Sequence, residues 1–174
     1  RHSAHGDLVF TGRRSTLALG YAYATERDYR SHSVSGTASV DLPGKNTTFA
    51  LSYARNFDSV CDFDNGDAGP LERQSLRAEH KCFDGTAATT TITHALSIDT
   101  AQAALTQNLS PTAAVQLGLF GQIVNGFQSS PYRRVRVAGF DAQENSPRVR
   151  ARSAAHARVN LAIPALRSAI SFQL

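Results

Sequence analysis

Ser33-Val34-Ser35-Gly36-Thr37-Ala38-Ser39-Val40-Asp41-Leu42 alternates without interruption between polar side chains and small or apolar ones. Successive side chains of an extended strand point to opposite sides, so a period of two gives the strand one polar face and one apolar face. The stretch therefore predicts a half-buried β-strand.

The same alternation continues on both sides of this stretch. Leu17, Leu19, Tyr21 and Tyr23 share one face, and so do Phe49, Leu51 and Tyr53. With a first strand near Leu8–Thr11, we expect about eight strands. The others lie in His94–Leu109, where we expect a bulge or a misplaced strand boundary, and in 113–123, 149–161 and 167–174. They are roughly 10 to 16 residues long, which suits a tilted membrane-crossing strand better than the short strand of a soluble protein.

The connections differ in length. Short turns are predicted at Leu42–Asn46, Ser110–Thr112 and Ile163–Arg167, each with a proline. Long polar loops are predicted at about Asp58–Thr91 and Asn125–Ser146. Short turns at one end and long loops at the other are typical of outer-membrane barrels.

Composition excludes one membrane class and leaves another open. Mean hydropathy is −0.27 and no run of about 18 apolar residues occurs, so a transmembrane helix is excluded. The net charge is +4, but only Lys45 and Lys81 among the eighteen basic residues are lysines. Nucleic-acid binders usually mix lysine with arginine on one face, so we expect no nucleic acid. Because no Met or signal peptide opens the chain, we expect one domain, 1–174, that is part of a longer chain.

Cys61 and Cys82 flank a polar segment rich in Asp and Gly and have no metal-ligand spacing. We expect a disulfide that closes a surface loop, which requires an oxidising compartment. Between them, Asp62, Asp64 and Asp67 form a weak candidate for calcium, but the EF-hand pattern is not met. A solvated turn is favoured, and we expect no metal and no cofactor. No catalytic motif is present, so we do not expect an enzyme.

Arg148, Arg150, Arg152 and Arg158 are spaced to share one strand face. An arginine on the lipid face of a barrel costs roughly 2–4 kcal/mol near the midplane, so this face should lie outside the membrane or point into the lumen. There the arginines either attract anions or pair with acids such as Asp41 or Asp99 and fill the barrel.

One segment resembles a known family. Asn125-Gly126-Phe127-Gln128-Ser129-Ser130-Pro131-Tyr132-Arg133-Arg134-Val135-Arg136 is similar to the signature Gly-Phe-x-x-Asn-Pro-Tyr-Arg-x-Val-Arg. The later stretch Glu144-Asn145-Ser146-Pro147-Arg148-Val149-Arg150-Ala151-Arg152 is similar to the segment Pro-Glu-x-x-Pro-x-x-Arg-x-Arg that follows this signature. That signature marks a family of unknown function whose members are predicted to be Gram-negative outer-membrane barrels. The family-motif residues are Gly126, Phe127, Pro131, Tyr132, Arg133, Val135 and Arg136, and the resemblance is good from about His94 to Leu174. It implies a barrel longer than this chain.

The sequence therefore predicts an all-β, antiparallel, up-and-down transmembrane barrel in a bacterial outer membrane. Lipid is the expected partner, and a protein partner or oligomer is allowed. Candidates for the aromatic girdles are Tyr21, Tyr23, Tyr53, Phe49 and Phe57. The first functional hypothesis is a passive pore for small, anionic solutes. The alternatives are a scaffold barrel with a filled lumen whose loops bind a partner, and a soluble β-sandwich or lipocalin-like binding protein.

Overall fold

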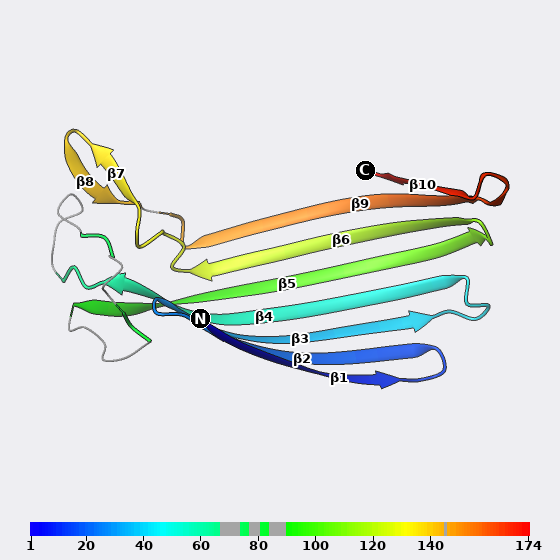
Figure 1. Cartoon of the computed structure of the whole chain (residues 1–174), viewed down its shortest axis with the longest axis horizontal. Coiled ribbons are helices and arrows are strands. Elements are labelled where there is room, and N and C mark those ends of the chain that lie inside the picture. Colours follow the sequence, from blue (N-terminus) through cyan, green and yellow to red (C-terminus); the bar gives the residue numbers. More distant parts are fainter. Residues whose placement is uncertain (67–73, 77–80, 84–89, 145) are drawn as a thin grey trace.

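One curved antiparallel sheet of eight strands makes up most of the chain (Figure 1). The computed structural model describes residues 1–66, 74–76, 81–83, 90–144 and 146–174. In spatial order the strands are β1 (His2–Thr11), β2 (Ser15–Thr25), β3 (Tyr29–Asp41), β4 (Thr47–Phe63), β5 (Thr91–Ser110), β6 (Ala113–Gly126), β9 (Val149–Ile163) and β10 (Ser168–Gln173). Apart from the small hairpin inserted between β6 and β9, neighbours in space are neighbours in sequence, as predicted for an up-and-down meander. The sheet is open, with β1 and β10 at its two edges.

The register brings most of the large apolar residues of the eight strands to the same side. Tyr21 lies opposite Val34, Leu51 opposite Ala38 and Ala103, and Leu105 opposite Leu117. We call this side the apolar face. Tyr23, Val115 and Val159 on this face are half-buried. Its exposed large side chains include Leu8, Phe10, Leu17, Leu19, Tyr21, Val34, Val40, Phe49, Leu51, Tyr53, Leu105, Leu117, Leu119, Ile123, Val149, Leu161, Ile170 and Phe172.

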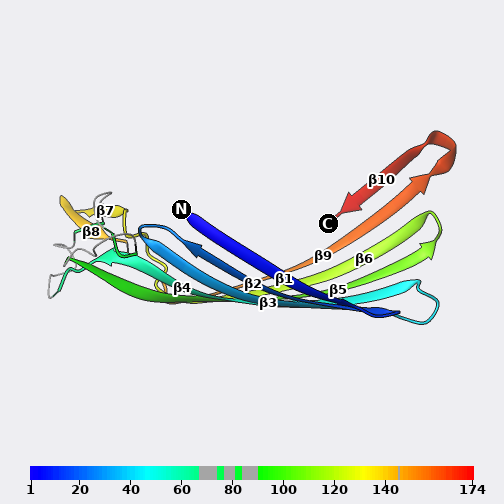
Figure 2. The ribbon, with the colours of Figure 1, turned by 60° about the horizontal axis from the view of Figure 1, so that its bottom comes forward.

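The opposite side, the polar face, is lined mainly by Ser, Thr, Gln, Ala and Gly. Figure 2 shows that the sheet curves into a trough. Along β2 the side chains of the polar face are less exposed than the leucines and Tyr21 beside them, which places the polar face on the concave side. Side chains crowd there: the imidazole of His156 occupies the space that a Cβ at Gly118 would need.

Little of the chain is buried. Cys61, Leu76 and Val124 are the buried apolar residues of the described part, and they lie toward the loop end of the sheet rather than along its middle. No helix in the described ranges is long and apolar enough to cross a membrane. The sheet is therefore held by strand pairing and not by a central hydrophobic core.

The three short turns lie where the sequence predicted them, at Pro43, Pro111 and Pro164. The third turn contains a short 3-10 helix, η1 (Pro164–Leu166). The predicted long loops need two corrections. Asp58–Phe63 belongs to β4, and the 125–146 segment contains a two-stranded hairpin of β7 (Arg134–Val137) and β8 (Phe140–Gln143). Ala138 and Gly139 both adopt positive φ at its tip, the geometry of a tight hairpin turn. The first strand also begins earlier than predicted, at His2.

The irregularity expected within His94–Leu109 lies at the end of that range. The pairing of β5 with β6 is regular from Leu96 to Asn108 and shifts between Asn108 and Ser110, at Leu109. Leu96 and Ile98 lie on the polar face, where Val124 opposite Ile98 is buried, whereas Leu105 lies on the apolar face. The large apolar residues of β5 therefore lie on different faces in its two halves, although the pairing between them is regular.

Candidate functional site

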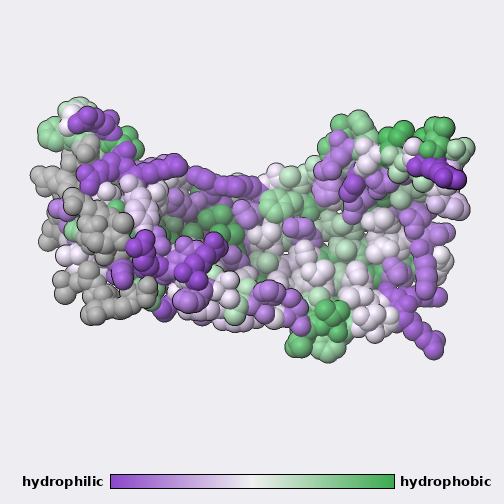
Figure 3. Space-filling model, viewed as in Figure 1, coloured by the Kyte–Doolittle hydropathy of each residue, from purple (hydrophilic) through white to green (hydrophobic). Residues whose placement is uncertain are grey.

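The arginine strip, Arg148, Arg150, Arg152 and Arg158, lies on the polar face along β9 and the residue that precedes it. All four side chains are exposed. Figure 3 looks into the trough and shows a hydrophilic band where β9 runs. Arg158 donates from Nε to the Ser171 hydroxyl at 3.0 Å.

The expected pairing of these arginines with Asp41 or Asp99 does not occur. Asp99 points to the apolar face, where Tyr53 donates to it at 2.5 Å and Arg55 lies 3.6 Å away. Asp41 is on β3, four strands away from β9 in the sheet, and accepts a hydrogen bond from Thr48 at 2.7 Å.

Aromatic side chains gather on the apolar face toward the loop end. Tyr21 hydrogen-bonds to His32 at 2.7 Å, and the ring of Tyr23 lies 4.9 Å from the same imidazole. The Arg55 guanidinium lies 5.1 Å from the ring centre of Phe57. Phe49 lies four residues from Tyr53 toward the turn end. These contacts give the aromatic residues polar partners at one border of the apolar face.

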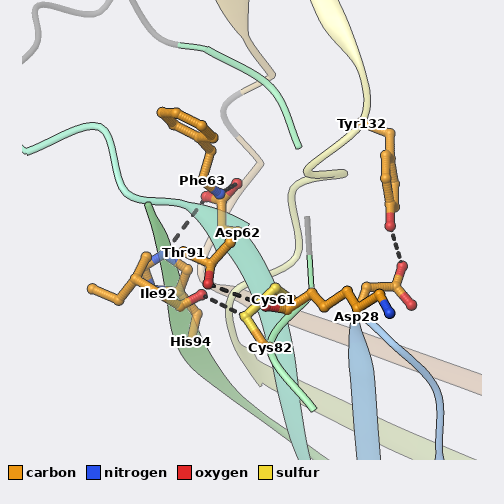
Figure 4. Close-up of a disulfide and its surroundings, with 10 residues drawn as sticks. Asp28, Cys61, Asp62, Phe63, Cys82, Thr91, Ile92, His94 and Tyr132 are labelled. Carbon is orange, nitrogen blue, oxygen red and sulfur yellow. Dashed lines mark hydrogen bonds and ion pairs between the residues drawn. A yellow bond between two sulfur atoms is a disulfide. The ribbon is translucent and has the colours of Figure 1, made fainter. Parts of the chain in front are cut away.

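Cys61 and Cys82 form the predicted disulfide, with an S–S distance of 2.08 Å and a Cα–Cα distance of 5.7 Å (Figure 4). Cys61 has no exposed surface. The backbone N–H of Cys61 donates to the carbonyl of Asp28 at 2.8 Å, and that of Cys82 to the carbonyl of Arg27 at 2.9 Å. The disulfide therefore joins the end of β4 to the β2–β3 loop as well as to its own loop.

The family-motif segment docks on this same region, and its first residues explain why. Gly126 ends β6 at a φ of +117°, and a Cβ there would collide with the Ala95 carbonyl oxygen and approach the Leu96 Cα to 2.9 Å. Only glycine fits both conditions. Phe127 then stacks on His94, with ring centres 4.5 Å apart, and His94 in turn lies 3.6 Å from Asp62.

Further along the motif, Pro131 is buried and its carbonyl accepts a hydrogen bond from the N–H of Leu76 at 2.8 Å. The Tyr132 hydroxyl donates to Asp28 (Figure 4). Partial burial of the ring, followed by the hydrogen bond and negative charge of Asp28, raises the pKa of Tyr132 to about 12. These contacts join several segments into one unit, which we call the loop cluster: residues 26–28, 61–63, 74–76, 81–83, 94 and 126–132.

The remaining motif residues extend away from the loop cluster. Arg133 is exposed and its N–H donates to the Ser130 carbonyl at 3.3 Å. Val135 and Arg136 lie in β7 and are exposed on opposite faces of the hairpin. Arg134, the first residue of β7, donates from Nε to the Ser75 hydroxyl at 2.8 Å.

The weak calcium candidate falls partly outside the described residues. Asp62 contacts His94 and accepts from the Phe63 N–H, and Asp64 accepts from the Gly66 N–H at 3.0 Å. Asp67 lies outside the described residues. Within the part that the structure describes, no group of three potential ligands forms a metal site.

Sequence reasoning missed His94, Asp28 and Leu76, which the loop cluster brings together with the motif. Asp28 lies in a three-residue joint, and Leu76 lies in a polar loop, so neither has a periodic pattern around it. The sequence did offer a signal for His94, because it shares a strand face with Leu96, two residues further along the chain.

Residues 1–173 match the model of a family described as "Protein of unknown function (DUF3570)". The chain belongs to this family. The match spans the whole DUF3570 sheet, which is more than the His94–Leu174 part that the motif indicated. No curated protein and no solved structure matches the chain.

Proposed function

We propose that this DUF3570 chain forms part of the wall of a transmembrane β-barrel in a bacterial outer membrane, and that its polar face lines a passage for small solutes. The apolar face carries this proposal. It is continuous over eight strands, and its large side chains are exposed, among them Leu19, Leu51 and Leu119. Lipid is the partner that would cover it.

A water-exposed location for this face is unfavourable. Soluble monomers rarely expose a contiguous apolar patch larger than roughly 300–600 Å². A soluble sandwich would cover the face with a second sheet, but in the described ranges the second sheet is only the small β7–β8 hairpin. Membrane lipid removes the cost because its tails are themselves apolar.

Strand lengths support the same placement. β6 has 14 residues, β4 has 17 and β5 has 20. A tilted strand needs about 9–11 residues to cross the bilayer, so the loop ends of β4 and β5 would extend beyond it. The border of the lipid-covered part would then follow Tyr21, Tyr53 and Phe57, since aromatic residues favour the interface. Free strand edges are not tolerated in lipid, so the proposal includes strand partners for β1 and β10.

A scaffold barrel is the second candidate, and the loop cluster favours it. A disulfide and several hydrogen bonds hold the loops together, and the β7–β8 hairpin beside them exposes Val135, Val137 and Phe140. A fixed loop surface of this kind suits the binding of a protein partner. We assign no enzymatic step to either candidate.

The first test of the barrel is membrane fractionation followed by gel mobility. We expect the protein to stay with urea-washed outer membranes and to shift in mobility on boiling in detergent. Release into buffer by urea would refute the membrane placement and favour a soluble β protein.

Planar-bilayer conductance then separates a pore from a scaffold. A pore gives discrete current steps after insertion of the purified protein, whereas a filled barrel gives none. The boiled protein, which has lost its fold, is the control for contaminating channels.

A further inference from the structure

Charge is separated across the polar face. In the first four strands this face carries Asp7, Asp41, Asp58 and Asp62 and no Lys or Arg. In β5, β6, β9 and β10 it carries Arg150, Arg152 and Arg158 and no Asp or Glu. Arg148, directly before β9, adds to the basic side. The uncharged concave positions of β5 and β6 lie between the two groups.

Among the residues of the sheet, this separation leaves the basic side without acidic partners. Asp41 is bonded to Thr48 and Asp62 contacts His94. Adjacent strands are about 4.8 Å apart, so β9 lies roughly 14 Å from β4 along the sheet, beyond direct ion-pair distance. Within the described part of the chain, Arg148, Arg150 and Arg152 form no ion pair.

The spacing of these guanidiniums indicates the ligand. Alternate residues of a strand are about 6.6 Å apart, so neighbouring arginines of the strip can reach one small anion together. Arginine binds phosphate and carboxylate oxygens through two parallel N–H donors, which single-charged halide ions cannot use. Arg150 also lies opposite Val124, which is only 9% exposed, and an apolar neighbour strengthens a charge interaction.

We infer that Arg148, Arg150 and Arg152 form a binding strip for small multivalent oxyanions, phosphates and dicarboxylates, on the wall of the passage. This inference rests on the proposed function, because the passage is what brings solutes to the polar face. Exposed Arg133, in the segment before β9, adds positive charge on the loop side. That charge would raise the local anion concentration at the entrance.

The decisive experiment measures inorganic phosphate binding to the full detergent-purified protein by phosphorus NMR at low salt. Wild-type protein should broaden and shift the phosphate signal in a saturable way. Arg150→Gln/Arg152→Gln should weaken the affinity about two- to fivefold for each arginine removed, since the side chains are exposed. Arg13→Gln/Arg14→Gln removes the same charge from the β1–β2 turn and should leave binding unchanged.

A charge-conserving pair, Arg150→Lys/Arg152→Lys, separates charge from geometry. Binding weaker than wild type but stronger than the Gln variant supports bidentate recognition by the strip. Equal phosphate binding by wild type and the Gln variant, with both heat-modifiable, overturns the inference. So does equal weakening by the Arg13/Arg14 control, which would mean a net-charge effect.

This readout does not depend on conductance, so the two proposals can fail separately. Arginine-dependent phosphate binding without current steps would retain the strip and refute the pore. Current steps that select anions equally in wild type and the Gln variant would retain the pore and refute the strip.

Discussion

Replacement of Leu51 by arginine tests which solvent covers the apolar face. Leu51 lies in β4 between Ala38 and Ala103 and is 51% exposed. A guanidinium at this position finds small apolar neighbours across both strands and no acid. The substitution removes little buried surface, so its cost depends almost entirely on what lies outside the sheet.

The two environments give different magnitudes. If water covers Leu51, an exposed substitution changes the free energy of unfolding by about 0.5 kcal/mol or less. If lipid covers it, an arginine near the midplane costs roughly 2–4 kcal/mol. The larger cost corresponds to roughly a thirtyfold to several-hundredfold change in the folding equilibrium.

The assay is urea unfolding of the protein in lipid vesicles, with the unboiled gel band as the measure of folded protein. Ser52→Arg is the matched control, because Ser52 follows Leu51 on the polar face, opposite Thr37 and Gln102. We expect Leu51→Arg to lower the unfolding free energy by about 2 kcal/mol or more and Ser52→Arg to change it little. Equal, small effects of both substitutions would refute the lipid placement of the apolar face.

Three further predictions concern the loop cluster. Cys61→Ser/Cys82→Ser should lower the unfolding free energy by about 3 kcal/mol, as expected for a loop of this length. Addition of a reductant to the wild-type protein should reproduce this loss in a urea titration. No change in either experiment would mean that the disulfide does not stabilise the fold. Gly126→Ala should cost about 1–3 kcal/mol from its positive φ and the collision with Ala95, whereas Gly121→Ala in the same strand, with open space around its Cβ, should cost little; equal urea midpoints would contradict the geometry. Folding raises the pKa of Tyr132, so its contribution to stability is complete below the unfolded pKa of about 10 and is lost as pH rises toward 12. The difference in unfolding free energy between wild type and Tyr132→Phe should therefore shrink over that interval. Tyrosinate absorbance should show one fewer late-titrating tyrosine in the variant.

Much of the sheet could be predicted because each strand carries its own evidence. The alternation in 33–42 assigns Val34 and Val40 to one face and the serines to the other, whatever the neighbouring strands are. The predicted turns at Pro43, Pro111 and Pro164 have local causes as well. The β7–β8 hairpin was missed because it has only four residues in each strand, too few for a clear period.

The candidate site was only partly accessible from sequence. The spacing of Arg148, Arg150 and Arg152 placed them on one face, and the composition around Cys61 and Cys82 indicated a disulfide. That neither Asp41 nor Asp99 pairs with these arginines could not be predicted, because the two aspartates are similar in sequence context. The strand register places Asp99 on the apolar face beside Arg55, and the strand order places Asp41 four strands from β9.

The sequence by itself determined the two chemically different faces of each strand, because alternation acts over a few residues and needs no distant contact. The tertiary structure alone decided which strands share a face, which side is concave, and that Asp28, His94, Leu76 and Tyr132 meet in the loop cluster. Those contacts join residues up to 104 positions apart, and no local pattern encodes the pairing of such distant segments. They form because the meander brings the long loops to one end of the sheet.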